Sequence, residues 1–202
     1  MTEQKIIRFT DTEMRASGDK DMTVEGYALK FDKETVIGSN KYGWREKIAK
    51  TALDGAKLNN VVLNFNHSMS DLLAGVKNKS LTLTVDETGL KITAAIIDTS
   101  LGRDVYKLIK GGLINRMSFA ATIGESDWTY ADWDSDELDS RVILRLDTLY
   151  DVSAVTFPAY EDTEISARGL SADFKADLKA EMDLRRKQVY ERQMERLNKL
   201  LA

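Results

Sequence analysis

The chain has 202 residues, a formal net charge of −4, one histidine, one proline and no cysteine. Without cysteine it has no disulfides, thiolate nucleophiles or cysteine-ligated metal sites, which is compatible with a reducing cytosol. Its interspersed charges argue against nonspecific nucleic-acid binding, which depends on basic clusters. No apolar run approaches the roughly 18 residues of a membrane-spanning helix, and the polar N-terminus does not resemble a secretory signal.

The first half of the chain has the alternating apolar pattern of β-strands. Residues 1–22 predict a frayed end or an early strand, 33–42 a loop, and 51–57 a helical turn capped by Thr51. Gly26 is a candidate bulge. A short apolar run lies at 72–76, and strands are expected at 23–31, 44–48, 61–65, 81–85 and 90–97. The last two, joined by a turn at Asp86–Gly89, form the clearest hairpin.

A helix follows, with Leu101, Val105, Leu108 and Ile109 on one face. Thr99 or Ser100 caps it and Gly111-Gly112 ends it. The remaining expected segments are a strand or helix-to-strand turn at 113–123, an exposed acidic excursion at 124–140, and strands at 142–146 and 149–157. Many strands with one or two helices indicate a mainly β (α+β) domain, which we expect to be an antiparallel β-barrel with peripheral helices.

The composition changes at Leu170, beyond which the helix formers Lys, Arg, Glu, Leu and Met dominate. One apolar stripe there comprises Tyr190, Met194, Leu197 and Leu201, and Leu178 and Met182 extend it upstream. We expect a domain at 1–168 and a charged C-terminal helix at 169–202. This helix either packs on its own domain or pairs with another chain.

The single histidine, His67, follows the expected strand at 61–65. Enzymes that activate a serine commonly use an imidazole as the base. His67 is therefore either the only imidazole base of this protein or a residue with no catalytic role. If it is the base, its partner is a hydroxyl or a water, because the chain has no thiol.

Ser118 is the best candidate hydroxyl, because it lies among apolar residues just after the Gly-Gly helix end. A third group must orient the imidazole. Asp151 directly precedes the apolar run Val152–Val155, where an unpaired carboxylate would be costly. Asp98 and Asp147 also border apolar strands and remain alternatives. Taken alone, Ser118 and Asp151 also fit an ordinary strand serine and a solvated carboxylate at a strand edge.

Other kinds of site have little support. One histidine among scattered acidic residues does not predict a zinc site. Asp71, Asp86 and Glu87 could bind a hard cation, but no EF-hand loop is present, and the phosphate-binding glycine motifs are absent as well. We expect neither a metal nor a cofactor.

In the region 23–165, a set of segments resembles the prohead proteases of tailed phages of the HK97 type. The matching segments are Gly26-Tyr27-Ala28, Arg45-Glu46-Lys47-Ile48, Asn66-His67-Ser68, Gly89-Leu90, Gly111-Gly112-Leu113, Met117-Ser118-Phe119, and Asp151-Val152-Ser153-Ala154-Val155 with Pro158-Ala159. They occur in the order found in that family, and the ordered combination is more specific than any one of them.

The resemblance implies a fold like that of the herpesvirus assemblins and a serine endopeptidase. His67 matches the base of the family and Ser118 its nucleophile. Herpesvirus enzymes carry a second histidine at the position of Asp151, so here a Ser-His-Asp arrangement is expected. In the family, the donors that bind the oxyanion come shortly after the strand that contains this position. The resemblance therefore implies that backbone N–H groups near Ala159 and Tyr160 have this role.

The resemblance further implies cleavage of scaffold and major capsid proteins inside the assembling prohead, in the host cytoplasm, and cleavage of the chain itself. A homodimer through the C-terminal helix or a barrel helix is compatible with this interpretation. One alternative is a capsid-assembly scaffold that keeps the protease fold with little activity. Another is a small-ester hydrolase that uses the same serine and histidine.

Overall fold

The computed structural model describes residues 4–38, 43–131 and 137–156, together with scattered helical residues between 183 and 199. The elements are β1 (Gln4–Gly18), β2 (Thr23–Lys30), β3 (Thr35–Ile37), β4 (Trp44–Ile48), β5 (Val62–Phe65), β6 (Ser68–Gly75), β7 (Leu81–Val85), β8 (Gly89–Ala95), α1 (Ser100–Lys110), β9 (Arg116–Thr129) and β10 (Asp139–Val155). The expectation of a mainly β protein is therefore confirmed. Within the described residues, no helix is long and apolar enough to cross a membrane.

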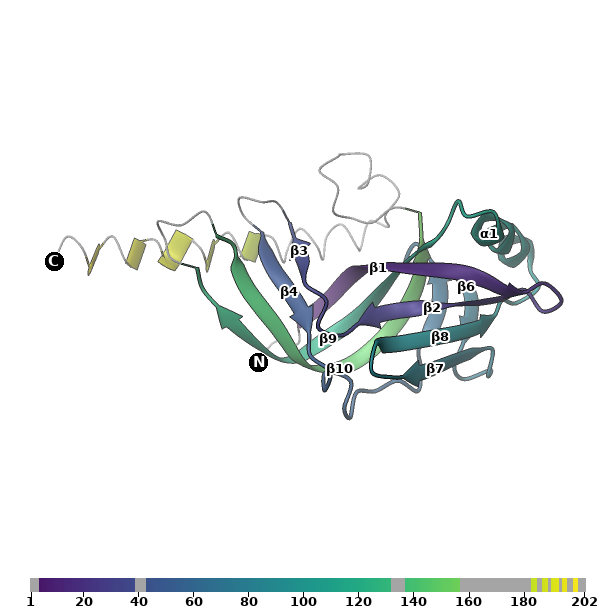
Figure 1. The fold of residues 1–202 in the computed structure, drawn as a ribbon, viewed down its shortest axis with the longest axis horizontal. Coiled ribbons are helices and arrows are strands. Elements are labelled where there is room, and N and C mark those ends of the chain that lie inside the picture. Colours follow the sequence, from purple (N-terminus) through teal and green to yellow (C-terminus); the bar gives the residue numbers. More distant parts are fainter. Residues whose placement is uncertain are drawn as a thin grey trace.

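The ten described strands form one mixed sheet, and eight of them follow one another in the order β3-β4-β10-β9-β1-β2-β8-β7. The long strands β9 and β10 run through the middle of this order (Figure 1). Strand β5 pairs with β10 and with β6, which makes a branch off the main path. Strands β4 and β5 lie along the same edge of β10, because β4 pairs with the first residues of β10 and β5 with its last residues.

The expected closed antiparallel barrel is wrong. The described sheet is open, with β3 and β7 at its two ends. It is also mixed, because β10 runs parallel to both β4 and β5. The physical reason lies in β10, whose pairing with β9 shifts register four times between Ile143 and Asp151. Such irregularities bend a strand, and here two separate strands share the edge of the bent β10, so the sheet branches.

Several strand predictions hold, and others need correction. The strand at 44–48, the hairpin of β7 and β8, and the cap and end of α1 are as expected. Residues 51–57 instead form successive turns, with hydrogen bonds that span three residues. The two strands expected at 142–146 and 149–157 are one strand, β10, and β9 continues to Thr129 into the expected acidic excursion. The boundary expected at 168/169 and most of the C-terminal stripe lie outside the described residues.

Gly26 is needed for close packing of two strands. A Cβ atom at this position would lie 2.7 Å from the Glu13 carbonyl oxygen and 3.0 Å from the Met117 sulfur. The register of β2 shifts between Tyr27 and Leu29, so Gly26 itself is not the bulge. A side chain at residue 26 would separate β2 from β1, which also pairs with β9.

The hydrophobic core lies on one face of the central strands. Met117, Phe119 and Ala121 of β9 belong to it, as do Val152 and Ala154 of β10. Successive side chains of a strand point to opposite faces. The intervening residues therefore point away from the core, and these include the buried polar residues Ser118, Thr122, Asp151 and Ser153.

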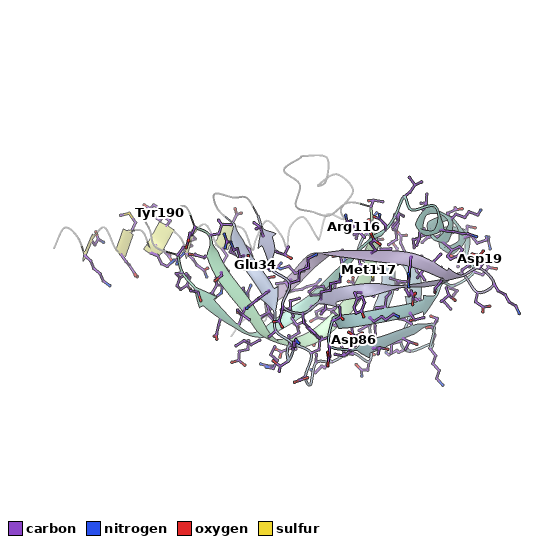
Figure 2. The ribbon with its side chains drawn as sticks, in the orientation of Figure 1. Asp19, Glu34, Asp86, Arg116, Met117 and Tyr190 are labelled. Atoms are coloured by element: carbon purple, nitrogen blue, oxygen red, sulfur yellow. The ribbon has the colours of Figure 1, made fainter. Side chains whose placement is uncertain are left out.

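Helix α1 packs at the end of the β1–β2 hairpin (Figure 1). Asp19, at the tip of this hairpin in Figure 2, accepts hydrogen bonds from the Tyr106 hydroxyl at 2.8 Å and from the Lys110 ammonium at 2.7 Å. The N-terminus of α1 is capped by the Thr99 hydroxyl, which accepts from the Gly102 N–H at 2.9 Å. These bonds attach the helix that precedes β9 to the hairpin formed by β1.

A buried ion cluster joins β1, β4 and β10. The Glu46 carboxylate pairs with the Arg8 guanidinium, and its Oε2 accepts from Arg8 Nη2 at 3.0 Å and from Trp44 Nε1 at 3.2 Å. Arg141 Nη1 lies 3.6 Å from the same oxygen. Burial by itself would raise the pKa of Glu46, but the Arg8 and Arg141 charges outweigh it and hold that pKa below its usual value.

Glu46→Gln should lower the free energy of unfolding at pH 7 by about 3–5 kcal/mol, because two buried guanidinium groups lose their carboxylate. The folded-state pKa of Glu46 is depressed. Its contribution is therefore present above the pKa of the unfolded state and is lost as the pH falls through the folded pKa. The difference in the free energy of unfolding between wild type and variant should therefore become smaller at acidic pH. Urea unfolding at neutral and acidic pH measures both effects.

The matched control is Glu34→Gln. Glu34, labelled in Figure 2, pairs with Arg45 at 3.7 Å. Both side chains are about half exposed. An exposed pair of this kind contributes at most about 1 kcal/mol. Equal losses for the two variants would mean that the buried cluster does not stabilise the fold.

Candidate active site

Two neighbouring strands supply two of the candidate residues. In the antiparallel pair of β9 and β10, Ser153 lies opposite Ser118 and Asp151 lies opposite Ala120. Asp151 and Ser118 are thus diagonal neighbours on the face that points away from the core. Diagonal neighbours are roughly 7–8 Å apart, a span that an imidazole bridges when each of its nitrogens makes a hydrogen bond.

His67 comes from the turn between β5 and β6. Phe65 and Ser68 pair across this hairpin, which leaves Asn66 and His67 as a two-residue loop. Both have a positive φ, 52° for Asn66 and 57° for His67. This is the pattern of a type I′ turn, whose second position normally favours glycine. A left-handed residue with a side chain costs about 1–2 kcal/mol, so the imidazole is held at some expense of stability.

The parallel pairing of β5 with β10 carries this turn to the candidate site. Val62 pairs with Asp151 and Phe65 with Ala154, so the end of β5 lies beside the end of β10. The Asn66 N–H then donates to the Ala154 carbonyl oxygen at 3.0 Å. The turn residues 66 and 67 therefore project over the residues of β9 and β10 that face away from the core.

The structure brings His67, Ser118 and Asp151 together in a continuous chain of contacts. His67 Nδ1 lies 2.6 Å from Asp151 Oδ1, and His67 Nε2 lies 2.6 Å from Ser118 Oγ. An ionised carboxylate only accepts hydrogen bonds, so Nδ1 carries the proton. In the neutral imidazole, Nε2 is then left as an acceptor for the Ser118 hydroxyl.

All three side chains are shielded from solvent. The exposed fraction of the side chain is 2% for His67 and 7% for Asp151, and the whole residue Ser118 is 0% exposed. Burial of the Asp151 carboxylate is tolerable because the imidazole N–H is its hydrogen-bond partner. Exclusion of water also strengthens the hydrogen bonds between the three groups.

The Ser118 hydroxyl has a second acceptor within reach. Ser118 Oγ lies 3.0 Å from the carbonyl oxygen of Arg8 in the neighbouring strand β1. A hydroxyl has a single proton to donate. When the proton points to His67 Nε2, the hydroxyl is prepared for deprotonation, and when it points to the Arg8 carbonyl, it is not.

The alternative carboxylates are engaged elsewhere. Asp98 pairs with Arg103 near the start of α1, and Asp147 pairs with Arg145 within β10. Asp151 is the one of the three with a described contact to His67. The expected oxyanion donors at Ala159 and Tyr160 lie outside the described residues. Among the described residues, no group of three or more His, Asp or Glu side chains is placed to hold a metal ion.

Sequence reasoning did not single out two residues that hold His67 in place. The Ser153 hydroxyl accepts from the His67 backbone N–H at 2.9 Å, and the Asn66 side-chain oxygen accepts from the Thr156 N–H at 3.2 Å. The period of two along β10 would have placed Ser153 on the same face as Asp151. The sequence contains no signal that this hydroxyl lies under the backbone of residue 67, because their contact spans 86 positions.

Comparison with known proteins identifies the family. The family described as caudovirus prohead serine protease matches residues 10–177. A structural match is the bacteriophage T4 capsid assembly protease gp21, with a TM-score of 0.49 and 15% identity over 78% of this chain and 100% of that chain. No curated protein sequence gives a significant match. Because the family match spans most of the sequence, including β9 and the end of β10, the chain belongs to the prohead serine proteases of tailed phages.

Proposed function

We propose that Ser118, His67 and Asp151 are the catalytic triad of this prohead serine protease. The observation that supports this most strongly is the pair of 2.6 Å contacts that link the two imidazole nitrogens to a carboxylate and a hydroxyl. A hydroxyl, an imidazole and a carboxylate that are hydrogen-bonded in this order form the arrangement that activates a serine for acyl transfer. Since His67 is the only histidine of the chain, no other imidazole competes for the role.

The reaction follows from these contacts. His67 Nε2 takes the proton of the Ser118 hydroxyl as Oγ attacks the carbonyl carbon of a peptide bond. The resulting imidazolium, stabilised by Asp151, gives that proton to the leaving amine as the C–N bond breaks. A water then attacks the acyl carbon while His67 takes one of its protons, and the imidazolium returns this proton to Ser118 Oγ as the ester C–O bond breaks and the acyl group leaves as a carboxylic acid. Asp151 holds the imidazole in the tautomer that both steps require.

The developing negative charge on the carbonyl oxygen needs hydrogen-bond donors. We assign this role to backbone N–H groups near Ala159 and Tyr160, a few residues beyond the end of β10. Each donor in such a site contributes about 3–4 kcal/mol of transition-state stabilisation. Their position in the sequence, shortly after the strand that carries Asp151, is the one that the family resemblance implies.

The proposed substrates are the scaffold and the major capsid protein, cleaved within the assembling capsid inside the host cell, together with the chain itself. Membership in the prohead protease family supports this assignment. The family match ends at residue 177, so most of the charged segment 169–202 lies beyond it. We propose that this segment is scaffold-like or forms a homodimer contact.

The proposed reaction requires that a substrate carbonyl reach the Ser118 hydroxyl. The Ser118 side chain is completely buried. A substrate carbonyl therefore reaches Ser118 Oγ only after the groups that cover it have moved.

Ser118→Ala should abolish cleavage and leave the fold intact, because it removes one buried oxygen and adds no bulk. The measurement is co-expression with the capsid genes of the phage, followed by mass spectrometry of the products. Ser126→Ala, in the same strand, is the matched control and should cleave like wild type. If Ser118→Ala still cleaves capsid protein, Ser118 is not the nucleophile. If capsids assemble equally well with the uncleaved products, a scaffold role dominates.

Asp151→Asn should lower the cleavage rate on the order of 10³–10⁴-fold, because the amide permits the wrong imidazole tautomer. The rate is measured on purified capsid protein under saturating conditions. Asp98→Asn and Asp147→Asn are matched controls, since each carboxylate pairs with an arginine away from His67. A normal rate for Asp151→Asn together with a slow Asp98 or Asp147 variant would transfer the orienting role to that residue.

A further inference from the structure

One buried hydroxyl beside the triad takes no part in the proton transfers described above. The Ser153 side chain is fully buried. Its Oγ accepts a hydrogen bond from the His67 backbone N–H at 2.9 Å and donates to the Asn64 carbonyl oxygen at 3.2 Å. The hydroxyl thus connects β10 to both ends of the segment Asn64–His67.

The backbone of this segment has to be held, because its conformation is unfavourable on its own. Asn66 and His67 both have positive φ values. Apart from the two contacts of the imidazole, three described hydrogen bonds join this turn to residues 153–156 of the chain. The Asn66 N–H donates to the Ala154 carbonyl, the Asn66 side chain accepts from the Thr156 N–H, and the His67 N–H donates to Ser153.

The strand that holds the turn also carries Asp151, two residues before Ser153. Ser153 lies directly opposite Ser118. The hydrogen bond to the Ser153 hydroxyl therefore fixes the distance between the His67 backbone and strands β9 and β10. The same two strands set the separation of Asp151 and Ser118. Because both imidazole contacts are 2.6 Å long, a small shift of the backbone breaks one of them.

A purely structural serine would not need the contact with His67. Donation to the Asn64 carbonyl already uses the proton of the Ser153 hydroxyl, and a buried hydroxyl with one good partner is adequately satisfied. Acceptance from the His67 N–H is a second contact. It is directed to the residue that carries the base.

We propose that Ser153 is a positioning residue that sets the imidazole of His67 between Asp151 and Ser118. This role rests on the triad proposed above. Ser153 touches neither the substrate nor the reacting atoms, and it acts through the backbone of residue 67. Loss of its hydroxyl leaves the His67 N–H without this acceptor and lets the turn relax away from β10.

The test compares Ser153→Ala with Ser153→Thr, which restores a hydroxyl, and with Thr122→Val. Thr122 is the matched control because it is buried on the same face of the sheet, in β9, and among the described residues its hydroxyl has no hydrogen-bond partner. Protein labelled with ¹⁵N-histidine gives the signals of one imidazole, since the chain has one histidine. The Nδ1 proton, bonded to Asp151, should resonate far downfield in wild type.

Ser153→Ala should move or broaden this proton signal and reduce kcat for capsid protein by about 10- to 100-fold, with KM within about twofold, as expected for a misplaced base. Thr122→Val should keep the wild-type signal and rate, and Ser153→Thr should recover most of both. Urea unfolding of each variant verifies that it is folded.

Two results would overturn the proposal. A wild-type imidazole signal and rate in Ser153→Ala would show that the hydroxyl is dispensable, and a lower kcat with an unchanged signal would show that it acts on something other than His67. Failure of the triad itself is a separate outcome, because it appears as cleavage by Ser118→Ala. The imidazole signal is recorded without any substrate, so it does not depend on that result.

Discussion

The register between β9 and β10 is the constraint on which the rest of the site depends. It places Ser153 opposite Ser118 and Asp151 opposite Ala120, so that a carboxylate and a hydroxyl lie diagonally across two hydrogen-bonded strands. A slip of one residue would turn either side chain to the opposite face. The core residues Met117, Phe119, Val152 and Ala154 prevent this slip, because it would move them out of the hydrophobic core. Packing on one face of the sheet therefore fixes the geometry of the polar groups on the other.

His67 reaches this pair because two strands share one edge of β10. The first part of β10 pairs with β4 and the last part with β5, in both cases in parallel. The β5–β6 hairpin thereby ends over the two central strands with His67 in its turn. The arrangement has energetic costs, among them two left-handed residues in the turn and a buried carboxylate at Asp151. Hydrogen bonds of the turn with Ser153, Ala154 and Thr156 offset the first cost, and the imidazole N–H offsets the second.

Much of the local structure follows from residue patterns. The cap and the glycine end of α1, the β7–β8 hairpin and strand β4 are determined by side chains close in sequence, so their bounds were predictable. The closed barrel was not a sound expectation, because closure depends on which edges meet, and the bends of β10 come from its pairing with β9. The role of Gly26 was also not predictable from nearby residues. A side chain there is excluded by Glu13 and Met117, which approach Gly26 only in the folded chain.

By itself, the sequence determined which chemistry is available: one imidazole, no thiol, and a serine and an aspartate within runs that resemble those of prohead proteases. It also ruled out a second histidine as the third member of the site. Only the tertiary structure decided between Asp151, Asp98 and Asp147 as the neighbour of His67, and only it placed Ser153 beneath the backbone of residue 67. The reason is physical. Residue types limit which groups can exchange protons, whereas the contacts between them span 51 to 86 positions and exist only once the strands have paired.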